Sequence, residues 1–302
     1  MALKQIKNKI KSTQRTSKVT KAMEAVSAVK MRKSQERALD GRSYAEAALR
    51  ILERVSHVRD AKSHPLFAEH TEGKHLFVIV TSDKGLAGGL NSAVLKEASI
   101  QISRFRKDDV ALICFGKKSY EFFTRRGYDV PMHFLNIQDE VALADMEAAA
   151  VHIANGFIAR QYQRVEMVFQ TFVSTFEQRA VHKKLLPLKS SDLQEIVRDI
   201  RPKHGKFSDV SSETKAEAYT VEPNQEAVYS ELFPLLIRIM LYHALLENKA
   251  SEHSARMVAM KNATDKAKEV TKTLTLKYNK ARQAVITREV SEITGGMEAM
   301  KN

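Results

Sequence analysis

The positions of proline and glycine constrain the fold of this chain more than any other feature. All six prolines lie between Pro65 and Pro234 of the 302 residues. Residues 1–64 contain no proline and a single glycine, and residues 235–294 contain neither. Because these two residue types interrupt helices, the sequence predicts one long helix at each end of the chain. Helices of such length need a partner to be stable, so we expect the two to pair.

The C-terminal segment shows the alternating spacing of four and three residues that is typical of a coiled coil. Its expected seam consists of two lines that repeat every seven residues: Ile239, Leu246, His253, Met260, Ala267, Leu274 and Ala281, and Leu236, His243, Ala250, Met257, Thr264, Thr271, Tyr278 and Val285. The N-terminal segment is less regular. Its apolar residues predict a stripe that turns around the helix: Ile6, Ile10, Val19, Ala22, Val26, Val29, Ala45, Leu49 and Leu52. The simplest arrangement is an antiparallel pair.

Between the two arms, short β-rich runs alternate with helical stretches. Strands are expected at residues 75–80, 110–115, 165–172 and 185–188, and helices at residues 93–106, 118–125 and 141–161. Such alternation predicts a mostly parallel sheet. We expect residues 190–218 to form a loop with a helical turn.

The expected fold class is therefore α/β, with a long antiparallel coiled coil of the N- and C-terminal helices plus a central Rossmann-like α/β domain. The expected division is residues 1–64 for the first coiled-coil helix, residues 65–225 for the central domain and residues 226–302 for the second helix.

Basic residues are concentrated near the start of the chain. The net charge is +13, and residues 1–33 contain ten Lys or Arg and one acid, Glu24. This segment predicts an acidic partner, but the sign of the charge alone leaves nucleic acid, an anionic lipid surface and an acidic protein as alternatives. Residues 1–40 lack Phe, Tyr and Trp, which argues against base stacking. A mitochondrial transit segment is a further alternative, although the helical pattern continues past residue 50.

Few residues suggest chemistry. The single Cys114 excludes an intramolecular disulfide and is expected in the core. His243 and His253 fall on the expected seam, where packing is a simpler role than metal binding. The longest apolar run, residues 235–246, is shorter than the roughly twenty residues that span a bilayer. We expect no catalytic residue, no metal and no cofactor.

The glycine-rich stretch "GLAGGLN" at residues 85–91 is the most enzyme-like feature. A loop of this kind before a helix can hold a phosphate. However, a phosphate loop of the Walker type requires Lys and then Ser or Thr after its last glycine, and here Leu90 and Asn91 follow Gly89. We expect a structural turn with Asn91 capping the next helix. A nucleotide-binding enzyme remains an alternative hypothesis, as does a nucleic-acid-binding protein.

Four separated motifs carry a resemblance that spans essentially the whole chain. They are "STQRTSKVTKAMEAVSAVKMRKSQ" at residues 12–35, "TSDKGLAGGLN" at residues 81–91, "ARMVAMKNATDKA" at residues 255–267 and "YNKARQAVITREVSEITGG" at residues 278–296. The sequence closely resembles the gamma subunits of F-type ATP synthases. The resemblance implies a central-stalk rotor with no catalytic site of its own. Such a subunit couples rotation of a membrane ring of c subunits to ATP synthesis or hydrolysis in a head of alpha and beta subunits.

The same resemblance implies partners and a location. The partners are the alpha and beta subunits of the head, the epsilon subunit and the proton-translocating c ring, and no nucleic acid. The implied location is peripheral, on the cytoplasmic face of a bacterial inner membrane, without a transmembrane segment.

Individual positions are carried over from the matching motifs. Contact with the head is implied for these residues: Lys18, Lys21, Met23, Lys30, Arg32, Lys33, Arg256, Gln283, Thr287 and Glu289, with Glu292 nearby. Tyr219 is implied to contact epsilon and the c ring. For each lysine the alternative role is a solvated helix face.

Overall fold

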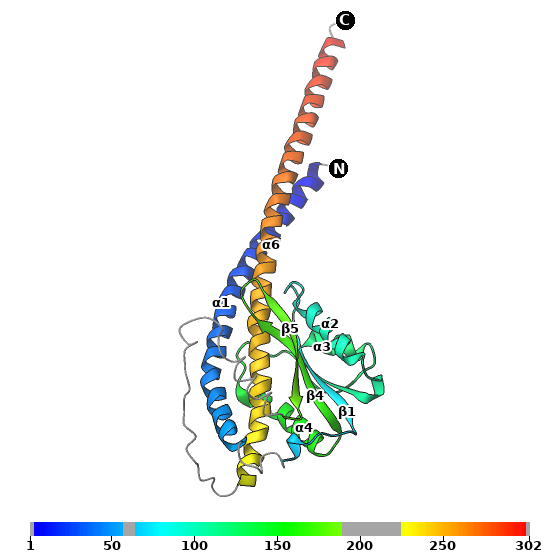
Figure 1. Cartoon of the computed structure of the whole chain (residues 1–302). Helices are drawn as coiled ribbons and strands as arrows, with labels where there is room; N and C mark the ends of the chain where they lie inside the picture. Colours follow the sequence, from blue (N-terminus) through cyan, green and yellow to red (C-terminus); the bar gives the residue numbers. More distant parts are fainter. Residues whose placement is uncertain (1–2, 57–63, 189–224, 300–302) are drawn as a thin grey trace. The chain divides into compact units, whose positions relative to one another are not determined.

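The computed structural model describes residues 3–56, 64–188 and 225–299, so the expected loop at 190–218 and Tyr219 lie outside the described residues. The chain forms two compact units, one of Met1–Ala28 with Arg256–Asn302 and the other of Val29–Ala255. Two long helices, α1 (Leu3–Ser56) and α6 (Gln225–Ala299), each contribute residues to both units (Figure 1). The expected pair of long terminal helices is confirmed. In the described part of the chain, no helix is both long and apolar enough to cross a membrane.

The larger unit is built on a five-stranded sheet with the order β3-β2-β1-β4-β5. The strands are β1 (Lys74–Val80), β2 (Val110–Phe115), β3 (Asp129–Phe134), β4 (Tyr162–Phe172) and β5 (Gln178–Leu186). The pairs β3–β2, β2–β1 and β1–β4 are parallel, and β5 pairs antiparallel with β4. The expectation of a mostly parallel sheet is confirmed.

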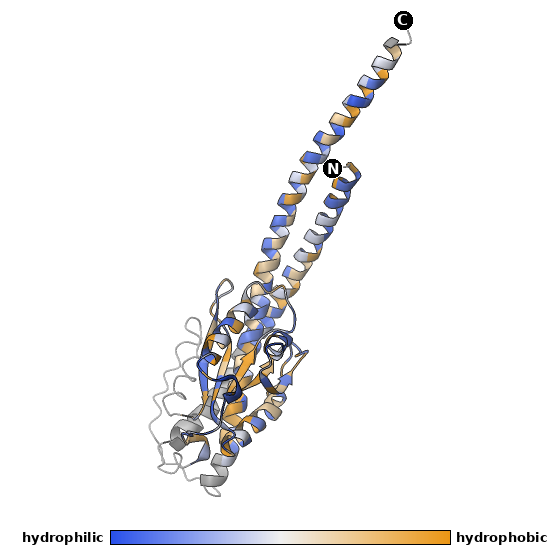
Figure 2. Cartoon of the chain, turned by 90° about the vertical axis from the view of Figure 1, so that its right-hand side faces the viewer, coloured by the Kyte–Doolittle hydropathy of each residue, from blue (hydrophilic) through white to orange (hydrophobic). Residues whose placement is uncertain are grey.

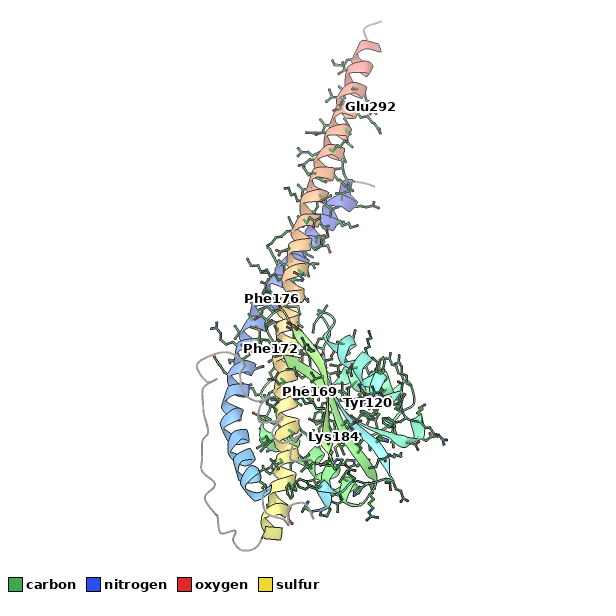
Figure 3. All side chains as sticks on the ribbon, viewed as in Figure 1. Tyr120, Phe169, Phe172, Phe176, Lys184 and Glu292 are labelled. Carbon is green, nitrogen blue, oxygen red and sulfur yellow. The ribbon has the colours of Figure 1, made fainter. Side chains whose placement is uncertain are left out.

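Short helices connect the strands and cover the sheet. They are η2 (Pro65–Phe67), α2 (Leu90–Ile102), η3 (Lys107–Asp109), α3 (Lys117–Thr124), η4 (Leu143–Met146) and α4 (Glu147–Ile158). Because successive strand residues point to opposite faces, β1 sends Leu76, Val78 and Val80 to one core and Phe77 and Ile79 to the other. Helices α4 and α6 cover the first core, and α2 and α3 cover the second. Figure 3 labels Phe169, which belongs to the first core, and Tyr120, which packs against the second.

The part of α6 that belongs to this unit is buried on nearly every side. Phe233, Leu236 and Ile237 are at most 1% exposed, and the helix continues through Pro234 without a break. Its position against the sheet explains why the run from Leu235 to Leu246 is apolar without spanning a membrane.

Two strands and one helix differ from the expected bounds. Strand β3 was not expected, because it contains Pro131 and alternates between exposed and half-buried residues, as edge strands often do. Strand β5 begins at Gln178 instead of Leu185, because its first residues include charged side chains that suit the other sheet edge. The expected helix at 141–161 is shorter and is divided into η4 and α4. Cys114 is fully buried in β2, as expected, and burial raises the pKa of its thiol to about 12.

Gly116 is required by the backbone between β2 and α3. Its φ is +92°, and a Cβ there would overlap the carbonyl group of Thr81. We expect Gly116→Ala to lower the free energy of unfolding by at least about 2 kcal/mol, because left-handed backbone alone costs an L-residue roughly 1–2 kcal/mol. The measurement is urea unfolding followed by circular dichroism. Gly85→Ala is the matched control, because no atom lies within 4 Å of its added Cβ. Equal losses in the two variants would contradict this account.

Candidate shaft and contact surfaces

The smaller unit is a pair of antiparallel helical segments that meet along a regular seam (Figures 1 and 2). On α6, Met260, Thr264 and Ala267 are buried, and the seam continues through half-buried residues at the spacing expected for a coiled coil: Thr271, Leu274, Tyr278 and Ala281. This part of the expected C-terminal seam is confirmed.

The seam of α1 differs from the apolar stripe expected for the N-terminal arm. Its buried and half-buried residues also alternate by three and four, and they change from aliphatic at the start of α1 to mainly hydroxyl-bearing further along: Leu3, Ile6, Ile10, Thr13, Ser17, Thr20, Glu24 and Ser27. The expected stripe is confirmed at Ile6 and Ile10, and the side chains of Ala45, Leu49 and Leu52 lie outside the described residues. The stripe is wrong at Ala22, which is exposed, and at Val19, Val26 and Val29, which are 58%, 54% and 59% exposed. The physical reason is that small side chains let two helices approach closely, so the seam from Thr13 to Ser27 does not select for large apolar residues.

A hydroxyl pair fixes the register of the two segments. Thr20 Oγ1 lies 2.6 Å from Thr264 Oγ1, and Thr264 Oγ1 also donates to the carbonyl oxygen of Met260 at 2.8 Å. Thr20 Oγ1 also lies 3.2 Å from the carbonyl oxygen of Ser17, so each hydroxyl has a backbone acceptor on its own helix and either one can donate to the other. If this antiparallel register is continued, Leu3 falls opposite Ala281. Residues 282–299 of α6 therefore extend beyond the start of α1.

The extended end of α6 carries an uncovered apolar stripe. Ile286, Val290, Ile293 and Met297 are spaced by four, three and four residues and are 45%, 57%, 66% and 61% exposed. In Figure 2, hydrophobic positions alternate with hydrophilic ones along this end of the helix. The expected contact residues Gln283, Thr287 and Glu289 are exposed on the same segment, as is Glu292, which Figure 3 labels. We call residues 282–297 the distal segment.

The outward face of α1 in this unit is basic with an apolar centre. Lys18 and Lys21 are exposed, and Val19, Ala22 and Val26 are exposed beside them. Met23 is half-buried at the edge of the seam. Among the described residues, no ion pair involves Lys18 or Lys21. The three valines, Val29 included, were missed as surface residues, although their spacing of seven and then three could have indicated a second face.

The remaining expected contact residues lie in different environments. Arg32 and Lys33 are exposed in the larger unit, whereas Lys30 is bonded to Asp139. Arg256 is 8% exposed, so contact with another subunit would require its side chain to move.

The glycine-rich loop is held by hydrogen bonds within the chain. Asn91 does not cap α2, so that expectation is wrong. The cap position is Gly89, and Asn91 Oδ1 instead accepts from the backbone N–H of Ser82 at 2.9 Å. Leu86 has a φ of +62° and is 64% exposed. The amide of Asn91 is thus used to close the loop, which fits a structural turn.

The described residues offer little for catalysis. Within them, no group of three or more His, Cys, Asp or Glu side chains is placed to hold a metal ion. A polar cavity of about 250 Å³ is lined by residues that include His75, Gln163 and Arg164. Burial lowers the pKa of His75, although the charge of Glu166 opposes this. His253, expected as a packing histidine, is buried and bonded to Asp139.

These features define a class of protein: one that combines a pair of long antiparallel helices with a five-stranded α/β domain. Residues 2–300 match the ATP synthase family. The ATP synthase gamma chain of Pelotomaculum thermopropionicum is 38% identical over 300 residues, which cover 99% of each chain. The gamma chain of Cytophaga hutchinsonii is 36% identical over 307 residues, covering 100% of this chain and 99% of the relative.

Solved structures agree with this assignment. The central stalk and c-ring structure of the Tetrahymena thermophila mitochondrial ATP synthase contains a chain that is 26% identical, with a TM-score of 0.61, covering 81% of this chain and 99% of that one. A chain of the Euglena gracilis mitochondrial ATP synthase, in rotational state 3, shares the fold with a TM-score of 0.66 at 18% identity. The match covers 99% of the present chain and 94% of that one. The present chain belongs to the ATP synthase family, among the gamma chains. It is a central-stalk rotor subunit of an enzyme complex that synthesises or hydrolyses ATP.

The pairing of Thr20 and Thr264 can be tested with a double-mutant cycle. We expect Thr20→Val to lower the free energy of unfolding by about 1 kcal/mol, because a hydrogen bond in the seam is lost. Thr264→Val should cost a similar amount. The double variant should lose less than the sum, since two apolar groups then face each other. Thermal unfolding of the purified chain provides the measurement, and Thr273→Val, at an exposed position on α6, is the control. Additive losses would show that the two hydroxyl groups do not interact.

Proposed function

We propose that this chain turns inside a head of alternating alpha and beta subunits and has no catalytic site of its own. The observation that supports this proposal most strongly is the distal segment of α6. Four apolar side chains there form one exposed stripe, with exposed fractions from 45% to 66%. Exposed apolar patches of this kind mark surfaces that another protein covers. In this proposal, nucleotides bind to the head, and the distal segment is the end of the shaft that the head surrounds.

The chemistry of the stripe suits a bearing. Its side chains are aliphatic or thioether groups, which attract an apolar surface without directional bonds. A contact of this kind changes little in energy as the shaft turns. Exposed polar residues beside the stripe, Gln283, Thr287 and Glu289, are the ones for which we propose contact with the head. Arg256 is proposed for the same contact only after its buried side chain has moved.

The outward face of α1 supplies a second proposed contact with the head. Lys18 and Lys21 surround the exposed valines, and Lys30, Arg32 and Lys33 follow on the same helix. A partner with acidic loops around an apolar centre would match this surface, and charge attraction of this type mainly raises the association rate. We propose that beta subunits present such loops. Met23 would lie where the two helices meet beside this contact.

The α/β domain is proposed to meet the epsilon subunit and the c ring, with Tyr219 at that contact. Support comes from the Tetrahymena relative, whose structure is described as central stalk and c-ring. We propose that the chain is peripheral, on the cytoplasmic face of a bacterial inner membrane, and that protons are the coupling ion.

The distal segment can be tested with a matched pair of variants. Ile293→Asp should leave unfolding of the isolated chain unchanged within about 0.5 kcal/mol, because Ile293 is 66% exposed. It should reduce assembly with alpha and beta subunits at least about tenfold, since an unpaired charge would enter an apolar contact. The measurement is the yield of ATP-hydrolysing complex as the chain is titrated. The neighbouring Thr294→Asp adds the same charge beside the stripe and should have a smaller effect. Equal losses of assembly in the two variants would contradict the proposal that the apolar stripe contacts the head.

The basic face can be tested by charge reversal. We expect Lys18→Glu with Lys21→Glu to slow association with the head severalfold at low salt and to have less effect at high salt, because salt screens exposed charges. Stopped-flow association kinetics would measure this change. Lys96→Glu, on the exposed surface of α2, is the control. Unchanged kinetics in the double variant would show that these lysines are only a solvated helix face.

A further inference from the structure

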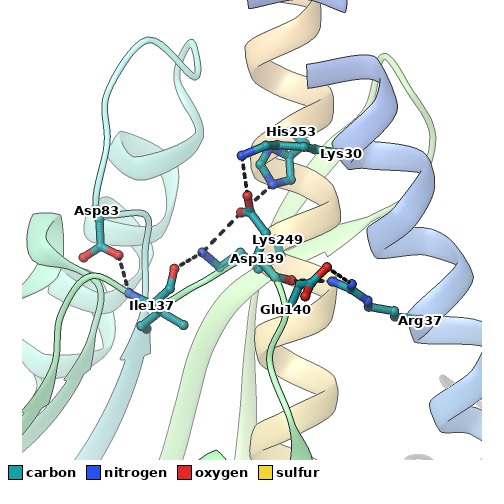
Figure 4. A network of polar contacts seen from close by, with 8 residues as sticks. All are labelled: Lys30, Arg37, Asp83, Ile137, Asp139, Glu140, Lys249 and His253. Atoms are coloured by element: carbon teal, nitrogen blue, oxygen red, sulfur yellow. Dashed lines mark hydrogen bonds and ion pairs between the residues drawn. The ribbon is translucent and has the colours of Figure 1, made fainter. Parts of the chain in front are cut away.

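Within the larger unit, one loop after β3 contacts both long helices (Figure 4). The carboxylate of Asp139 accepts a hydrogen bond from Lys30 Nζ of α1 at 2.6 Å and one from His253 Nε2 of α6 at 2.9 Å. Lys249 Nζ of α6 lies 3.8 Å from the same carboxylate. One acidic side chain is therefore shared by three basic side chains from two helices that are far apart in the sequence.

Backbone groups of the same loop strengthen the connection. Arg37 of α1 donates to the carbonyl oxygen of Asp139 at 2.9 Å and to Glu140 Oε1 at 2.6 Å. Lys249 donates to the carbonyl oxygen of Ile137 at 2.8 Å, and the N–H of Ile137 donates to Asp83 at 2.9 Å. The loop is thus tied to both helices and to the segment that follows β1. We call Lys30, Arg37, Asp139, Glu140, Lys249 and His253 the Asp139 clasp.

Burial makes the carboxylate hard to replace. The side chains of His253 and Lys249 are only 4% and 7% exposed, and that of Asp139 is 31% exposed. A buried cation is costly unless an acid or a hydrogen-bond acceptor compensates it. Partial burial acts to raise the pKa of Asp139, but hydrogen bonds from Lys30 and His253 and the charge of Lys249 lower it to about 2. The carboxylate therefore stays ionised at physiological pH.

The two helices differ in how they are attached to the α/β domain. Helix α6 contributes many residues to the first apolar core, from Leu232 to Leu245. In contrast, none of the described α1 side chains at 29–37 belongs to either core. Among the described residues, the hydrogen bonds from this part of α1 to the domain come from Lys30 and Arg37, and all of them end on Asp139 or Glu140. Lys30 and His253 also lie next to Val29 and Ala255, the first and last residues of this unit. The clasp is therefore located where both helices leave the unit.

We infer that Asp139 is a positioning residue that makes both helices turn together with the α/β domain, so that torque passes through the loop at 137–140. This inference rests on the rotor function of the chain. Apolar packing resists separation of α6 from the sheet, whereas directional ion pairs resist sliding and rotation of α1 against the loop. Loss of the carboxylate would leave the helices in place but loosen their connection under load.

The test uses the complete ATP synthase in inverted membrane vesicles. Asp139→Asn keeps the shape of the side chain and removes its charge. We expect ATP hydrolysis to stay within about twofold of the parent, while protons pumped per ATP fall at least about twofold, because a broken buried ion pair leaves uncompensated cations. The difference between variant and parent in protons pumped per ATP should grow as an opposing proton gradient builds up. Asp139→Glu should restore part of the pumping. Asp108→Asn, an exposed aspartate of η3, is the matched control and should behave like the parent.

Two outcomes would overturn the inference. One is an unchanged number of protons pumped per ATP in Asp139→Asn, and the other is an equal fall in hydrolysis, pumping and assembled complex, which would indicate a purely structural role. If the ATP synthase does not assemble with the Asp139→Asn chain, hydrogen exchange of the purified chain tests the inference instead. The inference requires faster exchange at residues 29–37 with unchanged exchange in β1 and β2. Failure of the parent chain itself to restore pumping to membranes without a gamma subunit would refute the rotor function, not the clasp.

Discussion

A narrow seam of small and hydroxyl side chains holds the two terminal helices together, and the other functional surfaces depend on it. Because Thr20, Ser27 and Thr264 fill the middle of the contact, Val19 and Val26 remain on the outward face of α1. The register set by Thr20 and Thr264 also ends the pairing near Ala281, which leaves the distal segment of α6 uncovered. A thin seam buries little apolar surface, so within the smaller unit each helix keeps most of its circumference exposed.

The chain uses a different kind of attachment where the helices meet the α/β domain. Helix α6 is held by an apolar core that includes Phe233 and Leu236, whereas the described hydrogen bonds and ion pairs from α1 to the domain all go to one loop. Apolar packing stabilises the attachment but does not depend on direction, whereas ion pairs and hydrogen bonds hold the groups at fixed distances and angles. The combination suits a part that must be firmly joined to its base and must still transmit twist. The carboxylate of Asp139 is central because three basic side chains converge on it.

Much of the fold could be predicted from the sequence, because the scarcity of proline and glycine near both ends of the chain indicates two long helices, and apolar runs mark the central strands β1, β2 and β4. The exact ends of the helices were not marked, since α6 continues through Pro234, Gly295 and Gly296. The edge strands were harder. Pro131 in β3 and the charged residues of β5 make these segments look unlike strands in the sequence. The seam of α1 was predicted wrongly because the prediction followed large apolar side chains, whereas the middle of this seam is filled by small ones. The role of Asp139 had no local signal at all, since Lys30 and His253 approach it only in the folded chain.

The central proposal is that the α/β domain and both helices rotate together, with the distal segment turning inside a stationary head. The most direct measurement is to observe a bead attached to the domain through Lys96→Cys, while the head is fixed to a surface. Selective labelling is practical because the native Cys114 is fully buried. We predict continuous rotation in one direction that requires ATP and stops when it is removed. A head that hydrolyses ATP at its normal rate while a firmly attached bead shows no directed rotation would contradict the account.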